Sequence, residues 1–149
     1  MPTFHLHEEP LQEAWLDAYG HLNEAFYLVP FSNATWRLQD RFGIGTEYFD
    51  RTGCALYTLE THLRYLAEVR PPAMLSIETT VLGLDAKRLH IGHVMWSGEH
   101  QCATFECMAL HYDTRAKRSA PFPDTVREAM SAAVPDALPD WACGSVRLL

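Results

Sequence analysis

A carboxylate, a glycine and a histidine lie close together in the segment Asp17-Ala-Tyr-Gly-His-Leu-Asn23, directly before a run of residues with helical spacing. The first turn of a helix has backbone N–H groups without partners, and the positive end of the helix dipole increases their preference for negative charge. Hydrolysis of a thioester creates such a charge on the carbonyl oxygen. Gly20 allows a ligand to approach the backbone, and Asp17 could activate water or attack the thioester directly.

A plainer interpretation of the same segment stays open at the level of the residues. Asp17 could be an ordinary turn residue and His21 an ordinary loop histidine, because a short motif of the form Asp-x-x-Gly occurs often without a function. The elements that would position these side chains therefore decide how much weight the motif carries.

The run that follows the motif predicts a long, mostly buried helix from Asn23 to Phe42. Asn23 is expected to cap its N-terminus and Gly43 to end it. Pro30 lies inside this run, removes one backbone hydrogen bond and predicts a kink between Phe26 and Pro30. The apolar positions with helical spacing are Ala25, Phe26, Val29, Trp36 and Leu38.

Beyond Cys54 the apolar period changes from helical spacing to two, which predicts consecutive strands. The expected strands are 3–9, 54–65, 74–83, 88–97 and 101–113, with a turn at 97–100. Short helices are expected at 46–51 and at 125–133, the second capped by Asp124, and the sheet is expected to end at 115–123. On the strand 54–65, one face is expected to carry Tyr57, Leu59, Leu63 and Tyr65, and the other Glu60, His62 and Arg64.

This order of elements predicts an α+β fold in which an antiparallel sheet wraps around one long central helix. The whole chain, 1–149, is expected to form a single domain, with a loosely held C-terminal tail at 134–149. An open sheet has unpaired edge strands, so a homodimer or a homotetramer is the expected assembly.

The composition excludes several classes of function. With 149 residues, 48% of them hydrophobic, and a net charge of −7, the chain suits a globular domain that does not bind nucleic acid. No stretch reaches the roughly 18 apolar residues that cross a bilayer, and the N-terminus lacks the pattern of a secretory signal. The scattered cysteines (Cys54, Cys102, Cys107 and Cys143) predict reduced thiols and a cytoplasmic location.

The motif Asp17-x-x-Gly-His-Leu-Asn with Tyr27 closely resembles the signature of the 4-hydroxybenzoyl-CoA thioesterase-like family. The segments 59–70 and 86–90 resemble further parts of that family, so the likeness covers roughly residues 3–130. The resemblance implies a hotdog fold, dimers or tetramers, and hydrolysis of an acyl-CoA thioester without a metal or cofactor. It makes Asp17 the catalytic carboxylate and the Glu24 backbone amide the oxyanion donor, whereas His21 and Asn23 would orient Asp17 and cap the helix.

Further segments, including 18–23, 84–90 and 111–115, resemble thioesterases of carnitine breakdown, whose substrate is betainyl-CoA. A trimethylammonium group is bound by aromatic faces or by a carboxylate. The expected substrate-binding residues are Gly20, Tyr27, Trp36, Tyr57 and Glu60. The competing interpretation is that these aromatic residues belong to the core, as aromatic residues at helix or strand spacing usually do.

Basic residues suggest where the phosphates of CoA would bind. Lys87 and Arg88 lie at an expected turn and could contact the nucleotide, although a solvated turn explains them equally well. A second basic cluster at 115–118 is a weaker candidate. Glu106 lies in an otherwise apolar strand and is expected either to line the pocket or to face solvent. The histidines form no group of three with metal-ligand spacing, so no metal site is predicted.

Two other functions fit the same fold. A hotdog hydratase or dehydratase would need an acid–base pair, for which His21 and Asp17 are available, but the motif favours hydrolysis. A non-catalytic acyl-CoA binding module would keep the basic turn and could dispense with Asp17, which this chain retains.

Overall fold

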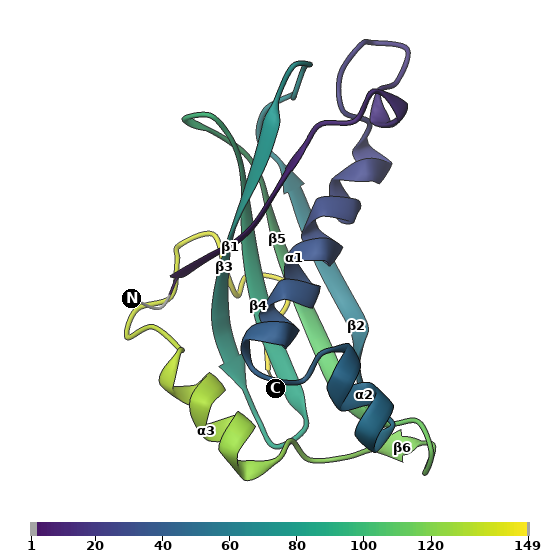
Figure 1. Cartoon of the computed structure of the whole chain (residues 1–149). Coiled ribbons are helices and arrows are strands. Elements are labelled where there is room, and N and C mark those ends of the chain that lie inside the picture. The colour runs from purple at the N-terminus through teal and green to yellow at the C-terminus, as the bar shows by residue number, and fades with distance from the viewer. Residues whose placement is uncertain (1–2, 149) are drawn as a thin grey trace.

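The computed structural model describes residues 3–148, in which a curled antiparallel sheet covers one side of a long helix (Figure 1). The order of strands across the sheet is β1-β3-β4-β5-β2, and a short β6 pairs with β5. The strands are β1 (Thr3–Pro10), β2 (Cys54–Tyr65), β3 (Met74–Leu84), β4 (Arg88–Ser97), β5 (His100–Asp113) and β6 (Arg118–Ser119). The predicted α+β arrangement is confirmed, and β1 and β2 form the two edges.

The helical segments are two single turns and three α-helices. They are η1 (Glu13–Trp15), η2 (Glu24–Tyr27), α1 (Leu28–Arg41), α2 (Thr46–Thr52) and α3 (Asp124–Ala132). In the part of the chain that the structure describes, no helix has both the length and the apolarity to cross a membrane.

The long helix α1 is fixed to the sheet by an aromatic stack and by the hydrogen bonds of a buried histidine. The ring of Phe31 is fully buried and stacks on Phe105 of β5, with 4.9 Å between ring centroids. Beside it, the imidazole of His93 on β4 bonds Thr35 of α1 at 2.8 Å and Thr79 of β3 at 2.9 Å. Because both ring nitrogens have partners, the buried histidine is satisfied, and it ties the helix to the middle of the sheet.

The structure explains why the long helix tolerates its proline. The helix starts as the 3₁₀ turn η2 and becomes α-helical only at Leu28, so Pro30 falls in the first turn of α1. The N–H groups of a first turn have no partner within the helix, and a missing one costs little there. The predicted cap is confirmed, because the Asn23 side chain accepts a hydrogen bond from Ala25 N–H, and Gly43 follows the helix end with φ +72°.

The predicted faces of β2 hold for residues 60–65 but are wrong for Tyr57, because a bulge lies between them. The register with β5 shifts between Thr58 and Glu60, so the strict alternation breaks at that point. Tyr65 pairs with Ala103 and Tyr57 with Leu110, seven residues further along β5, which places the two tyrosines on opposite faces of the sheet. Tyr57 accordingly stacks on Tyr112, on the face away from α1.

Two further predictions near the C-terminus are corrected. Asp124 is the first residue of α3 and does not cap it, since Pro123 occupies the cap position. The tail, expected to be loosely held, packs on the outer face of the sheet, where Val146 is buried. A Cβ on Gly92 would lie 2.7 Å from the Trp141 ring, so glycine at this position gives the tail room to dock.

Three buried histidines predict that stability falls with acidification. Burial lowers the pKa of His90, His93 and His111, that of His93 to about 3. Because the unfolded chain takes up a proton near pH 6.5 and the folded chain does not, stability is complete above about 6.5 and is lost as pH falls toward 3. We expect His93 alone to contribute a decline of about 1.4 kcal/mol per pH unit in this window.

Guanidinium unfolding between pH 7.5 and 5 measures this decline. The variant His5→Gln, which removes an exposed histidine, should show the same slope as the wild type. A free energy of unfolding that is independent of pH over this range would contradict the assignment of neutral buried histidines.

Candidate active site

The motif forms a tight loop between η1 and η2. The Asp17 and Gly20 backbones close a turn in which Gly20 N–H donates to the Asp17 carbonyl at 3.0 Å, and Asp17 N–H donates to the His21 carbonyl at 3.1 Å. Gly20 has φ +81°, a backbone conformation that residues with a Cβ rarely adopt. The glycine of the motif is therefore required by the turn itself, whether or not a ligand approaches it.

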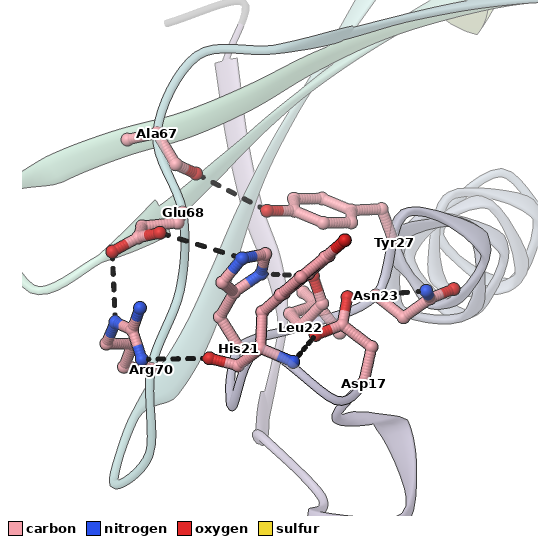
Figure 2. Close-up of polar contacts among 9 residues, drawn as sticks. Asp17, His21, Leu22, Asn23, Tyr27, Ala67, Glu68 and Arg70 are labelled. Atoms are coloured by element: carbon pink, nitrogen blue, oxygen red, sulfur yellow. Dashed lines mark hydrogen bonds and ion pairs between the residues drawn. The ribbon is translucent and has the colours of Figure 1, made fainter.

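The Asp17 carboxylate is oriented by two donors from this loop, shown in Figure 2. Its Oδ1 accepts a hydrogen bond from Tyr19 N–H at 2.9 Å, and its Oδ2 faces Asn23 Nδ2 at 3.4 Å. The same Asn23 side chain caps the helix by accepting from Ala25 N–H at 3.0 Å. One residue thus joins the carboxylate to the start of the helix, in the arrangement that the motif predicts for Asn23.

The Glu24 amide lies at the first position of the helical run, and the cap does not use it. Ala25 N–H is used by the Asn23 side chain, and Phe26 N–H donates to the Asn23 carbonyl at 3.0 Å. Glu24 is the first residue of the helical run, so its N–H has no partner earlier in the helix. It lines the same cleft as Asp17, which suits an oxyanion donor.

The second wall of the site is the turn that follows β2. Leu22 N–H donates to the Val69 carbonyl at 2.8 Å, which joins this turn to the motif loop. Arg70 reaches in both directions, since its Nε donates to Glu68 at 2.9 Å and its Nη1 donates to the Tyr19 carbonyl at 3.2 Å (Figure 2). These contacts hold the two walls at a fixed separation.

His21 faces this second wall. Its Nε2 lies 3.6 Å from Glu68 Oε2 and its Nδ1 lies 3.3 Å from the Leu22 carbonyl. The structure therefore pairs the imidazole with Glu68 and does not place it in hydrogen-bond contact with Asp17, the residue that the motif expects it to orient.

Between the walls lies an open cleft of about 470 Å³. Its lining residues are Asp17, Tyr19, His21, Leu22, Asn23, Glu24, Tyr27, Tyr65, Leu66, Ala67 and Glu68. Burial, the neighbouring Cys102 and Tyr65, and the charges of Glu68 and Asp17 raise the pKa of Tyr27 to about 12. The Tyr27 hydroxyl stays protonated and donates to the Ala67 carbonyl at 3.3 Å.

Several residues predicted to bind substrate lie outside this cleft. Gly20 is in the motif loop and Tyr27 lines the cleft, but Trp36 and Tyr57 border a separate groove beside α2. Glu60 pairs with Met108 on the outer face of the sheet, away from α1. For Trp36, Tyr57 and Glu60 the expectation came from residue type alone, and the bulge in β2 moved Tyr57 to the face opposite Tyr65.

The predicted CoA-binding residues lie at the opposite end of the sheet. Lys87 and Arg88 belong to the turn between β3 and β4, whereas the cleft is at the end of the sheet where β2 finishes (Figure 1). The Arg88 guanidinium is engaged by Asp85, with Nη2–Oδ2 at 2.6 Å. These two side chains do not reach the cleft of their own subunit.

Glu106 neither lines the cleft nor faces solvent, the two positions expected from the sequence. It is buried on the outer face, where its carboxylate contacts His90 Nε2 at 3.0 Å and accepts from Cys143 N–H of the tail at 2.7 Å. The Cys143 sulfur lies 4.0 Å from the other nitrogen of His90. These hydrogen bonds attach the tail to the sheet. Among the described residues, His90, Glu106 and Cys143 also form a group of three whose possible ligand atoms lie within 4.8 Å of one another, close enough to hold a metal ion, and the sequence spacing did not reveal this group.

Sequence reasoning missed Tyr19, Tyr65, Glu68 and Arg70, which build the cleft with the motif. Tyr19 lies inside the motif, but an exposed aromatic residue in a loop does not by itself indicate that it lines a site. The other residues lie more than forty positions further along the chain, and only the pairing of β2 with β5 and the turn beyond it brings them beside the motif.

Comparison with known proteins identifies the family of this chain. A family model described as the thioesterase-like superfamily matches residues 12–130. The betainyl-CoA thioesterase of Pseudomonas aeruginosa is 41% identical over 128 residues, which cover 85% of this chain and 80% of that protein. An L-carnitine dehydrogenase/betainyl-CoA thioesterase of Agrobacterium fabrum is 38% identical over 146 residues, 95% of this chain, but the chain spans only 30% of its length.

Solved structures show the same fold. A candidate thioesterase from Pseudomonas putida superimposes with a TM-score of 0.81 and 34% identity, over 100% of this chain and 99% of that one. A hypothetical protein of Staphylococcus aureus, solved in complex with CoA, gives a TM-score of 0.84 at 21% identity, over 99% and 94% of the two chains. The expected hotdog fold is confirmed. The chain belongs to the thioesterase-like superfamily, and within it the chain is a thioester hydrolase of the acyl-CoA thioesterase class.

Asn23 both faces Asp17 and caps the helix, and its capping role predicts an effect on stability. Asn23→Ala removes the helix cap and should lower the free energy of unfolding by about 1 kcal/mol, whereas Asn23→Ser retains a capping oxygen and should cost only a few tenths. Denaturant unfolding of both variants measures the difference. Equal stability of the two variants would show that the cap does not contribute.

Proposed function

We propose that this protein hydrolyses a small acyl-CoA thioester to a free acid and CoA, with Asp17 as the catalytic carboxylate and Glu24 N–H as the oxyanion donor. The observation that carries the proposal is the Asn23 bridge, which holds a carboxylate and the open end of a helix on one cleft. Asp17 either deprotonates water or attacks the thioester carbon, and both routes place negative charge on the carbonyl oxygen beside the helix start.

The acyl group that we propose is betainyl, an acetyl group that bears trimethylammonium on its methyl carbon. Relatives at 41% and 38% identity carry betainyl-CoA thioesterase in their names. The cleft supports a cationic acyl group, because it offers three tyrosine rings and three carboxylates. The relative fused to a dehydrogenase has a second activity in its name, and that activity lies outside this proposal.

We further propose that two copies assemble through β2. Within residues 3–148, this edge strand pairs only with β5, and exposed apolar side chains surround it. They are Phe26, Leu28, Trp36, Tyr57, Leu59, Tyr65 and Leu66. Antiparallel pairing of two β2 edges would bring the Lys87–Arg88 turn of one copy toward the cleft end of the other, which would give CoA phosphates a basic partner.

The two rival functions receive less support. A hydratase would use His21 with Asp17 as an acid–base pair, but His21 faces Glu68. A binding module would not need an oriented carboxylate at the helix start. No metal, no cofactor and a cytoplasmic location stay predictions; the four cysteines are free thiols, which suits a reducing compartment.

The test of the catalytic proposal is Asp17→Asn, which keeps the size of the side chain and one of its two accepted hydrogen bonds but removes its charge. Release of CoA thiol from betainyl-CoA should fall by about 10²- to 10⁴-fold in kcat, while binding of CoA stays unchanged. Asp50→Asn, on the exposed surface of α2, is the matched control and should retain full activity. Undiminished hydrolysis by the Asp17 variant would remove this carboxylate from the mechanism.

The assembly is tested by Leu59→Glu, which introduces a charge into the apolar surface along β2. Light scattering coupled to gel filtration should give a dimer or tetramer for the wild type and a monomer for the variant. Leu138→Glu, also an exposed leucine but in the tail, is the control and should not change the mass. A wild-type monomer at micromolar concentration would contradict assembly through this edge.

A further inference from the structure

One face of the cleft is built by residues that neither the motif nor the predicted substrate set includes. Tyr65 ends β2, and Glu68 follows it in the turn before β3. The Tyr65 hydroxyl donates to the Glu24 carbonyl at 3.0 Å, and its ring meets the buried Tyr27 ring edge to face, with centroids 4.9 Å apart. Half of the Tyr65 residue remains exposed, so its ring is held in place and still accessible to a ligand.

The Glu68 carboxylate is held by a separate set of contacts. Arg70 Nε binds its Oε1 at 2.9 Å and His21 Nε2 lies 3.6 Å from its Oε2, yet the side chain is 56% exposed. Glu68 itself lines the cleft, and Arg70 does not. The arginine therefore fixes the carboxylate from behind and leaves it open toward the space between the walls.

The charged side chains of the cleft give it a negative charge. Asp17, Glu24 and Glu68 all line it, and neither a lysine nor an arginine is among the described residues that do. Even when the nearby Arg70 is included, carboxylates outnumber guanidinium groups. The raised pKa of Tyr27, to which Glu68 and Asp17 contribute, is a second sign of this negative field.

We propose that Tyr65 and Glu68 determine acyl specificity by selecting a group with a permanent positive charge, an inference that rests on the proposed hydrolysis at Asp17. The ring of Tyr65 attracts the cation through its π face. The Glu68 carboxylate attracts the same cation through its negative charge. A negatively charged acyl group is repelled by the same three carboxylates. An uncharged acyl group of equal size fits but gains neither attraction.

A pair of substrates of the same shape isolates this effect. Betainyl-CoA and 3,3-dimethylbutyryl-CoA differ only in a positively charged nitrogen that replaces a carbon at the branch. For the wild type we expect kcat/KM to be about 100-fold higher for the charged substrate, corresponding to the sum of one cation–π contact and one nearby carboxylate. Equal kcat/KM for the two substrates, with Asp17-dependent hydrolysis of both, would overturn the specificity proposal and leave the proposed function intact.

Variants assign the preference to the two residues. Glu68→Gln and Tyr65→Leu should each reduce the ratio of the two kcat/KM values by about 10-fold, chiefly by raising KM for betainyl-CoA more than KM for the neutral substrate. Tyr65→Phe keeps the ring and should retain most of the preference, and Glu47→Gln, on exposed α2, should retain all of it. High salt should weaken the preference of the wild type more than that of Glu68→Gln, which retains only the carboxylates of Asp17 and Glu24 in the cleft.

The remaining outcomes separate the two proposals. A preference that survives in both Glu68→Gln and Tyr65→Leu would place charge recognition elsewhere and overturn this inference. If neither CoA thioester is hydrolysed, or if Asp17→Asn remains fully active, the proposed function fails first and the specificity proposal falls with it.

Discussion

The hydrogen bonds of a single side chain, Asn23, connect the fold to the chemistry of this protein. Its oxygen caps the helix and its nitrogen faces the Asp17 carboxylate, so the position of the carboxylate is set by the start of the buried helix. The position of that start depends in turn on Phe31 and on the hydrogen bonds of His93, which tie α1 to the middle of the sheet. Packing far from the cleft therefore determines the geometry within it.

A second constraint is that the opposite wall comes from a distant part of the sequence. The turn after β2 is joined to the motif loop through Leu22 and Val69, and Arg70 spans both. Because these contacts are between backbone groups or are charge-assisted, the width of the cleft does not depend on flexible side chains alone. The same turn supplies an aromatic ring and a carboxylate, so one structural element both shapes the site and gives it a negative charge.

The parts of the account that could be predicted from sequence are those that depend on local order. The motif before the helix, the cap at Asn23, the stop at Gly43 and the strand boundaries follow from residue types at short spacing. The errors arose where distant segments meet. The bulge in β2 reversed the face of Tyr57, the docked tail buried Glu106, and the partners Tyr65 and Glu68 became neighbours of Asp17 only through strand pairing.

The most direct measurement of the central claim is a crystal structure with a non-hydrolysable thioether analogue of betainyl-CoA that retains the carbonyl. The account predicts that the carbonyl oxygen lies about 2.7–3.1 Å from Glu24 N, with the Asp17 carboxylate beside the carbonyl carbon. An analogue bound in the groove of Trp36 and Tyr57, with its carbonyl remote from the start of the helix, would contradict it.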